Sequence, residues 1–185
     1  MTKIAPSILA ADLSKINNEV INVDKAGAEY IHIDVMDGHY VPNISFGPNI
    51  VETLRPLTKK ILDVHLMITP VMPYIKAFID AGADIISFHP EADDNSKTII
   101  ETIKSANCKA GIAIHPNVEI EAIQEFLNDI DLVVVMTVVP GFGGQKFLDT
   151  QLSKINKLYY IRESAKAKFE IEIDGGINEQ TSKQC

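Results

Sequence analysis

Residues 26–38 read Ala-Gly-Ala-Glu-Tyr-Ile-His-Ile-Asp-Val-Met-Asp-Gly, and this stretch decides the fold class. Gly27 follows a helical pattern, which predicts a left-handed helix cap, and an apolar strand begins directly after it. A similar junction recurs at residues 81–86, which read Ala-Gly-Ala-Asp-Ile-Ile. Convergent capping and a true internal repeat explain this recurrence equally well. In both cases helix leads straight into strand, which predicts parallel strands joined by crossover helices.

Outward from this stretch, short apolar runs alternate with longer amphipathic runs along the whole chain. The pattern predicts seven strands, near Ile4–Leu9, Tyr30–Val35, Ile61–Leu66, Ile85–His89, Ala110–His115, Leu132–Val138 and Phe169–Asp174. Asp12 is the expected N-cap of a first helix, and further helices are predicted at Pro48–Leu54, Val71–Ala81, Ser96–Ala106, Glu119–Asn128 and Asp149–Lys166. Because no linker interrupts this alternation, we expect a single α/β domain over residues 1–185.

Composition restricts the class of protein. The 185 residues are 46% hydrophobic, which is enough for the core of one folded domain. Twenty-five acidic residues against 17 basic ones give a net charge of −8. This balance disfavours nucleic acid or an anionic membrane as partner, because no general basic surface is available. A small phosphorylated ligand remains compatible, since local backbone N–H groups can hold it.

The cysteines and the N-terminus indicate the compartment. Cys108 and Cys185 are too few for a disulfide scaffold and form no C-x-x-C metal motif. The N-terminus lacks the basic-then-apolar layout of a signal peptide. The most apolar stretch, Leu132–Pro140, is too short to cross a bilayer. We therefore expect a cytoplasmic protein without a membrane partner.

The strand in residues 30–35 carries two polar side chains on one face. His32 and Asp34 are two positions apart, so both point to the same side of the strand, together with Met36. Burying His and Asp in an apolar strand is costly unless they find partners. Taken alone, a His-x-Asp pair is more often a hydrogen-bonded core pair than a metal site.

Other strand ends repeat this pattern and favour a metal site. His65 precedes Met67 by two positions, as Asp34 precedes Met36, and Asp174 ends the seventh predicted strand. The carboxyl ends of parallel strands meet at one mouth of a barrel, so these side chains are expected to converge. Two imidazoles and two carboxylates suit Zn²⁺, Fe²⁺, Mn²⁺ or Co²⁺ better than Ca²⁺ or Mg²⁺.

Methionines and glycines gather at the same predicted mouth. Met36, Met67 and Met136 are more often core filler, but beside a metal they would form an apolar, polarisable floor. The turns Pro140–Gln145 and Gly175-Gly176 are rich in glycine, which lets backbone N–H groups approach an anion such as phosphate. His89-Pro90-Glu91 and His115-Pro116-Asn117 are interpreted as structural, and residues 91–94 as a solvated loop.

Taken in order, several motifs make the sequence resemble the ribulose-phosphate 3-epimerase family from Ile4 to Asn178. They are Ala5–Leu9, His32–Gly38, Val64–Met67, Pro140–Gln145 and Asp174–Gly176. The resemblance implies a TIM (β/α)₈ barrel that interconverts D-ribulose 5-phosphate and D-xylulose 5-phosphate. It also implies one divalent metal ion, with Zn²⁺ expected first, and a small phosphorylated ketose as substrate.

The resemblance also assigns roles to single positions. The residues matching the metal ligands are His32, Asp34, His65 and Asp174, and Asp34 and Asp174 match the two acid–base groups. The residues matching substrate contacts are Ser7, His65, Gly141, Phe142, Gly143, Gly144, Asp174, Gly175 and Gly176. Met36, Met67 and Met136 match methionines that line the pocket.

Two departures from the family pattern leave alternatives open. Val139 stands where the family usually has Asn before Pro-Gly-Phe-Gly-Gly. The family continues beyond Gly175-Gly176 with a further helix–strand–helix segment, so we expect a barrel truncated after strand seven, with the last strand–helix unit absent. A hexulose-6-phosphate 3-epimerase and a non-catalytic remnant are the alternative functions, and a homo-oligomer is compatible. A related decarboxylase is disfavoured, because its Asp-x-Lys pattern reads Asp63-Val64-His65 here.

Overall fold

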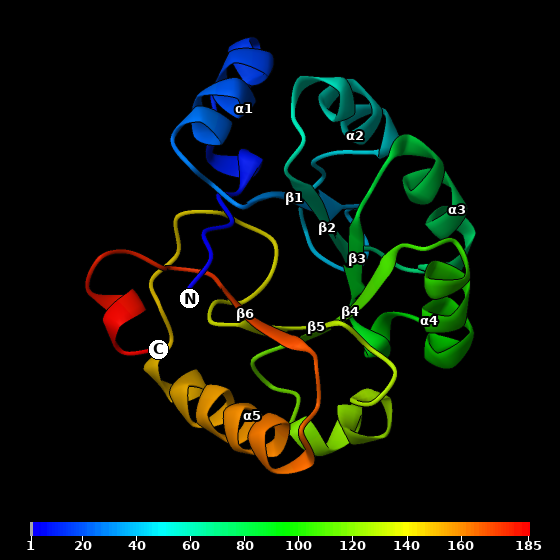
Figure 1. Cartoon of the computed structure of the whole chain (residues 1–185), viewed down its shortest axis with the longest axis vertical. Helices are drawn as coiled ribbons and strands as arrows, with labels where there is room; N and C mark the ends of the chain where they lie inside the picture. Colours follow the sequence, from blue (N-terminus) through cyan, green and yellow to red (C-terminus); the bar gives the residue numbers. More distant parts are fainter. Residues whose placement is uncertain (1) are drawn as a thin grey trace.

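The computed structural model describes residues 2–185, in which helices wrap the outside of a curled parallel sheet (Figure 1). Within these residues the sheet has six strands, hydrogen-bonded in sequence order. They are β1 (Tyr30–Met36), β2 (Ile61–Met67), β3 (Ile85–Phe88), β4 (Lys109–Ile114), β5 (Leu132–Met136) and β6 (Glu170–Asp174). All adjacent strands pair in parallel, as the alternation of helix and strand predicted.

The α-helices cover the outer face of the sheet and follow the predicted order. They are α1 (Ile16–Lys25), α2 (Pro48–Leu54), α3 (Met72–Ala81), α4 (Ser96–Ser105) and α5 (Leu152–Ala165). Asp12 caps a 3₁₀ turn, Leu13–Lys15, that leads into α1. Gly82 ends α3 with a φ of 99°, the left-handed cap that the sequence indicated. In the described part of the chain, no helix is both long and apolar enough to cross a membrane.

The first predicted strand, Ile4–Leu9, is not a strand of the sheet, so within residues 2–185 the prediction of seven strands is wrong. In the described part of the chain, this segment pairs with β1 only through a bridge between Ser7 and His32 and a few backbone hydrogen bonds. Pro6 has no N–H to donate, and the Ser7 side chain accepts from the N–H of Leu9 at 3.1 Å. That capping bond starts a 3₁₀ turn, Ile8–Ala10, which leads the chain away from β1.

A second difference concerns the helix predicted at Glu119–Asn128. The structure has a 3₁₀ helix at Ile120–Phe126 instead. Ile120 and Ile123 are buried, and Phe126 packs against the same core. This spacing of three residues matches the three residues per turn of a 3₁₀ helix and accounts for the tighter winding.

The two faces of the curled sheet have different chemistry. The outer face is apolar and packs against the helices, with Ile33, Val64 and Val133 fully buried in the main core. The inner face carries a smaller apolar cluster around Val134 and also the polar side chains of β1, β2 and β6. Because successive strand residues alternate between the faces, each strand builds the core and the interior together.

The gap between β6 and β1 is crossed by the N-terminal segment (Figure 1). The N–H groups of Tyr30 and His32 donate to the carbonyls of Ile4 at 3.3 Å and Pro6 at 3.0 Å. Lys3 donates to the carboxylate of Glu170 at 2.6 Å and to the hydroxyl of Tyr30 at 2.9 Å, and Tyr30 donates to Glu170 at 2.8 Å. This N-terminal seam thus connects the two ends of the sheet, reaching β1 through backbone hydrogen bonds and β6 through side chains.

Candidate active site

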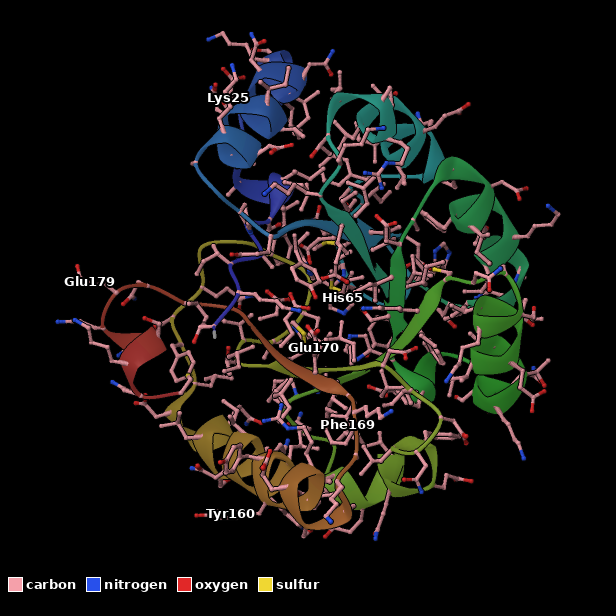
Figure 2. The ribbon with its side chains drawn as sticks, viewed as in Figure 1. Lys25, His65, Tyr160, Phe169, Glu170 and Glu179 are labelled. Atoms are coloured by element: carbon pink, nitrogen blue, oxygen red, sulfur yellow. The ribbon has the colours of Figure 1, made fainter. Side chains whose placement is uncertain are left out.

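Four polar side chains from three strands meet inside the curl of the sheet. His32 and Asp34 come from β1, His65 from β2 and Asp174 from the end of β6. The parallel register sets Asp34 beside His65. In Figure 2, His65 lies at the centre of the curl, whereas Lys25, Tyr160 and Glu179 lie at the periphery.

The facing atoms of these four side chains are close but do not hydrogen bond to one another. His65 Nδ1 lies 3.6 Å from Asp34 Oδ1 and 3.6 Å from Asp174 Oδ2. His32 Nε2 lies 3.4 Å from Asp34 Oδ1 and 3.9 Å from Asp174 Oδ2. His32 Nε2 and His65 Nδ1 are buried and have no hydrogen-bond partner within the described residues.

This geometry fits a divalent metal ion. One donor atom from each of the four residues lies within 4.8 Å of the others. Donors bound about 2.1 Å from a tetrahedral ion stand about 3.4 Å apart, which is close to the observed spacing. Two unpartnered buried imidazole nitrogens are costly unless a cation accepts their electron pairs. The site therefore suits a cation that prefers two nitrogens and two oxygens.

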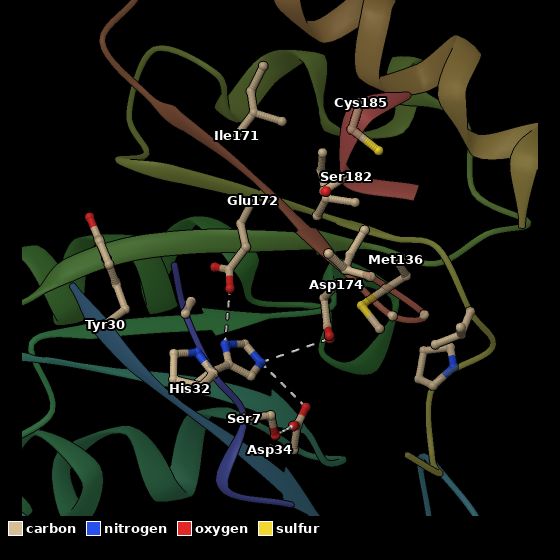
Figure 3. Close-up of a pocket in the computed structure, with 18 of the residues that line it drawn as sticks. Ser7, Tyr30, His32, Asp34, Met136, Ile171, Glu172, Asp174, Ser182 and Cys185 are labelled. Carbon is tan, nitrogen blue, oxygen red and sulfur yellow. Dashed lines mark hydrogen bonds and ion pairs between the residues drawn. The ribbon is translucent and has the colours of Figure 1, made fainter. Parts of the chain in front are cut away.

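The other ring nitrogen of His32 is held by carboxylates. Nδ1 contacts Asp63 Oδ2 at 2.7 Å and Glu172 Oε1 at 3.2 Å, and Figure 3 shows Glu172 above the ring. Burial, and next the charge of Asp63, raise the pKa of Glu172 to about 8. The raised pKa favours the neutral form of Glu172 more than for an exposed glutamate, so Asp63 is the main anionic partner of this ring. The carboxylate contact assigns the Nδ1 proton of His32 and leaves Nε2 facing the cluster.

The other ring nitrogen of His65 is held by a second imidazole. His65 Nε2 lies 3.1 Å from Nε2 of His89, and both rings are fully buried. His89 Nδ1 lies 3.5 Å from Glu91 Oε1. Burial lowers the pKa of His89 to about 4, so this ring is neutral at pH 7.

The charges of the cluster shift one another. Burial favours the neutral forms, but the surrounding imidazoles outweigh it and hold the pKa of Asp34 well below its usual range. Burial likewise lowers the pKa of His65, but its contacts with Asp174 and Asp34 outweigh it and raise that pKa to about 9. Ser7 adds a hydrogen bond to Asp34 Oδ2 at 2.5 Å. Without a metal ion, the cluster thus holds protons that an entering cation must displace.

A cavity of about 1110 Å³ opens over the cluster. Its lining includes residues expected at the site, namely Ser7, His32, Asp34, Met36, Met67, Met136, Gly141, Phe142, Gly143, Gly144, Asp174, Gly175 and Gly176. Gln145 holds the glycine-rich turn at residues 140–145 in place, because its side-chain amide donates to the carbonyls of Val139 at 2.6 Å and Phe142 at 2.8 Å. Within the described residues, the N–H groups of Gly143, Gly144, Gly175 and Gly176 donate no hydrogen bond.

Four residues that hold the site imidazoles, directly or through His89, were not identified as site residues from the sequence. They are Asp63, His89, Glu91 and Glu172. Asp63 and Glu172 stand two positions before a site residue, on the inward face of their strands, and this spacing is a signal that could have found them. His89 and Glu91 give no comparable signal, because their role depends on contacts between neighbouring strands.

Comparison with known proteins places the sequence among close relatives. The model of the ribulose-phosphate 3 epimerase family matches residues 3–185. The ribulose-phosphate 3-epimerase of Bacillus subtilis is 50% identical over 183 residues, which cover 98% of this chain and 84% of that protein. The ribulose-phosphate 3-epimerase of Rhodobacter capsulatus is 45% identical over 97% of this chain and 78% of its own length.

Two solved structures with the same fold have much lower sequence identity to this chain. A 3-keto-L-gulonate-6-phosphate decarboxylase from Vibrio cholerae superposes with a TM-score of 0.65 at 18% identity, covering 95% of this chain and 78% of that one. A tryptophan synthase α-subunit from Pyrococcus furiosus gives a TM-score of 0.71 at 12% identity, covering 97% and 80%. At these identities the likeness concerns the fold alone.

Proposed function

The chain belongs to the ribulose-phosphate 3-epimerase family and is an epimerase, and from this premise we propose that Asp34 and Asp174 invert carbon 3 of D-ribulose 5-phosphate to give D-xylulose 5-phosphate. One observation carries this proposal. Carboxylates from β1 and β6, the two ends of the open sheet, face the same point beneath a cavity. A sugar lying across that point has a carboxylate on each side.

The reaction requires two groups because the configuration at carbon 3 must be inverted. An ionised carboxylate removes the proton from carbon 3 on one face, which gives an enediolate. The other carboxyl group, protonated at the start, delivers its proton to the opposite face. The number of protons and the total charge are therefore the same before and after the reaction. After one turnover the first group is protonated and the second is ionised, so the reverse reaction uses the two groups in exchanged roles. A single base would return the proton to the face from which it came.

The four residues of the cluster are proposed to hold one divalent ion. Such an ion, when bound, supplies Lewis-acid stabilisation of the oxygens that become negative after proton removal. The two imidazoles and two carboxylates favour Zn²⁺, with Fe²⁺, Mn²⁺ or Co²⁺ as alternatives. Met36, Met67 and Met136 line the neighbouring wall and exclude water, which strengthens electrostatic interactions there.

The substrate phosphate is proposed to bind at the two glycine-rich turns. Gly143 and Gly144 follow β5, and Gly175 and Gly176 follow β6. Their free N–H groups line the cavity and can donate to phosphate oxygens. Backbone N–H groups can bind phosphate without basic side chains, which agrees with the net charge of −8 for this chain.

Exchange of the carbon-3 proton in heavy water tests this function. The full chain, supplied with Zn²⁺ and D-ribulose 5-phosphate in D₂O, is expected to form D-xylulose 5-phosphate that carries deuterium at carbon 3. Proton NMR follows both the conversion and the label. Absence of conversion, or conversion without deuterium at carbon 3, would contradict proton abstraction by the two carboxylates.

A further inference from the structure

A buried contact between two imidazoles lies behind the cluster. The Nε2 atoms of His65 and His89 are 3.1 Å apart, and both rings are fully buried. Two N–H groups at that distance would repel each other, and so would two electron pairs. One proton therefore lies between the rings, and a single hydrogen bond joins them.

The surroundings of His89 decide which ring carries that proton. His89 Nδ1 is buried without a hydrogen-bond partner in the described part of the chain, and the nearest charge is Glu91 Oε1 at 3.5 Å. Tyr40 donates to the same carboxylate oxygen at 2.9 Å, which favours the ionised form of Glu91. An anion in front of Nδ1 favours an N–H there and opposes an electron pair. A neutral His89 then has its electron pair on Nε2 and accepts from His65.

We propose that His89, oriented by Glu91, is a positioning residue that keeps a proton on Nε2 of His65 and so reserves Nδ1 of His65 for the cation. This inference rests on the proposed cation site of the epimerase. His65 Nδ1 faces Asp34 and Asp174 at 3.6 Å and is the atom that a cation must use. A cation held there would use the electron pair of Nδ1 and would leave the hydrogen bond from His65 to His89 unchanged.

The arrangement differs from the one behind His32. His32 Nδ1 contacts the carboxylate of Asp63 at 2.7 Å, which fixes that ring directly. His65 instead has a neutral ring between itself and the carboxylate of Glu91. Because Glu91 orients the ring of His89, and His89 accepts the hydrogen bond from His65, the orientation is set without another anion beside Asp34 and Asp174.

Nitrogen NMR of the imidazole rings tests this proton order without any assay of turnover. In the ¹⁵N-labelled full chain, we expect His89 to be the Nδ1–H tautomer and His65 to keep its Nε2 proton, both with and without Zn²⁺. Addition of Zn²⁺ is expected to shift Nδ1 of His65 and to leave the tautomer of His89 unchanged. An Nε2–H signal for His89 in either form would overturn the proposal.

Metal affinity of variants provides a second test. His89→Leu removes the acceptor and is expected to weaken Zn²⁺ binding, measured by chelator competition, about 10- to 100-fold. His89→Gln can still accept through its amide oxygen and is expected to rescue most of that loss. Glu91→Gln is expected to weaken binding less than His89→Leu does. Glu121→Gln serves as control, because Glu121 is exposed and does not line the cavity. Equal affinity in wild type, His89→Leu and Glu91→Gln would overturn the proposal.

The two tests separate this inference from the proposed function. A chain with the expected tautomers and metal affinities that fails to epimerise would refute the function and leave the positioning role intact. A chain that epimerises with an Nε2–H tautomer at His89 would refute the positioning role alone. Circular dichroism identifies a variant that fails to fold, and His89→Gln or Glu91→Gln then provides the comparison.

Discussion

Asp34 and Asp174 occupy unequal surroundings at the scale of single side chains. Asp34 is nearly fully buried and accepts a hydrogen bond from Ser7 at 2.5 Å. The side chain of Asp174 is 22% exposed and lies at the mouth of the cavity. The less exposed group is held more firmly, whereas Asp174 can adjust to substrate. This difference does not remove the need for both groups.

Replacing either carboxylate by its amide is expected to abolish epimerisation with little effect on the fold. Asp34→Asn and Asp174→Asn each remove one of the two proposed acid–base groups, which is expected to lower turnover about 10²- to 10⁴-fold. Steady-state turnover and far-ultraviolet circular dichroism measure the two effects. Asp80→Asn, on the exposed face of α3, is the control and should retain wild-type turnover. Near wild-type activity in either site variant would rule out the two-carboxylate scheme.

Gly176 is expected to tolerate no side chain. Its φ is 67°, and a Cβ would meet the backbone nitrogen of Phe147 at 2.5 Å. Gly144 has a φ of 71°, but a Cβ there would meet open space. Gly144→Ala is therefore expected to cost only the left-handed conformation, about 1 kcal/mol, and Gly176→Ala clearly more. Urea unfolding compares the two variants, and equal losses would show that the contact with Phe147 is relieved at little cost.

The convergence of His32, Asp34, His65 and Asp174 could be predicted from sequence because strand geometry is regular. A period of two places His32, Asp34 and Met36 on one face wherever the strand goes. The partners of the imidazoles could not be predicted in the same way. The contact of His65 with His89 depends on the curl between β2 and β3, and no local pattern records that curl.

At the scale of elements, the N-terminal seam connects the ends of the sheet through a small polar network. Glu170 accepts hydrogen bonds from both Lys3 and Tyr30. Burial raises the pKa of Glu170, but these two hydrogen bonds outweigh it, so the net pKa is lowered. A lowered pKa in the folded state stabilises the fold above the unfolded pKa of about 4.3, and this gain is lost as pH falls through the folded pKa.

Lys3→Met is expected to weaken this seam in a pH-dependent way. The ion pair is partly exposed, so at neutral pH the loss in free energy of unfolding is about 0.5 kcal/mol. The difference between variant and wild type should shrink as pH falls below the unfolded pKa of about 4.3, and it is lost once pH passes the lowered pKa of Glu170 in the wild type. Urea unfolding at pH 7 and pH 3 measures it. A difference that is the same at both pH values would show that Lys3 acts by packing alone.

Element type was predictable where the apolar period was long, and less so at short or mixed segments. The strands β1 to β6 and the α-helices lie close to their predicted ranges. Residues 4–9 fail because a serine side chain captures a backbone N–H and ends the pairing. The segment 119–128 is helical as predicted, but its pattern did not distinguish an α-helix from a 3₁₀ helix. The three-residue spacing of its buried side chains favours the 3₁₀ form.

At the scale of the whole molecule, the proposed cation would join β1, β2 and β6. Two of these strands are the ends of the sheet, which hydrogen bonds of the ladder do not connect. A cation held by all three would therefore oppose opening of the sheet. Ligands that bind only the folded state stabilise it according to their free concentration.

Zn²⁺ is accordingly expected to raise thermal stability. At a free concentration 100 times its Kd, the gain in free energy of unfolding is about 2.7 kcal/mol, and a chelator should reverse it. Differential scanning calorimetry measures the change in melting temperature. Ca²⁺ provides the control, because it prefers oxygen donors and two of the four donors here are nitrogens. An equal effect of Ca²⁺ would place the stabilising ion at another site.

The buried thiol of Cys108 is expected to report on global unfolding. Cys108 is buried, and burial raises its pKa to about 12, whereas Cys185 is exposed. A thiol reagent at pH 8 should therefore label Cys185 at once and Cys108 only when the chain opens. In Cys185→Ser the rate of labelling should follow urea concentration as stability does. Rapid labelling of Cys108 in native buffer would indicate that this side of the core opens locally.

The register of β1 and β2 affects stability and activity together, so it determines whether folded but inactive molecules can accumulate. Asp34 pairs with His65 on one face, while Ile33 pairs with Val64 on the other. A shift by one residue would turn the ligands outward and bring their apolar neighbours inward, so the same error removes both stability and activity. Misassembled molecules cannot then persist as well-folded, inert copies. A single strand register between β1 and β2 thus determines both the fold and the activity of each molecule.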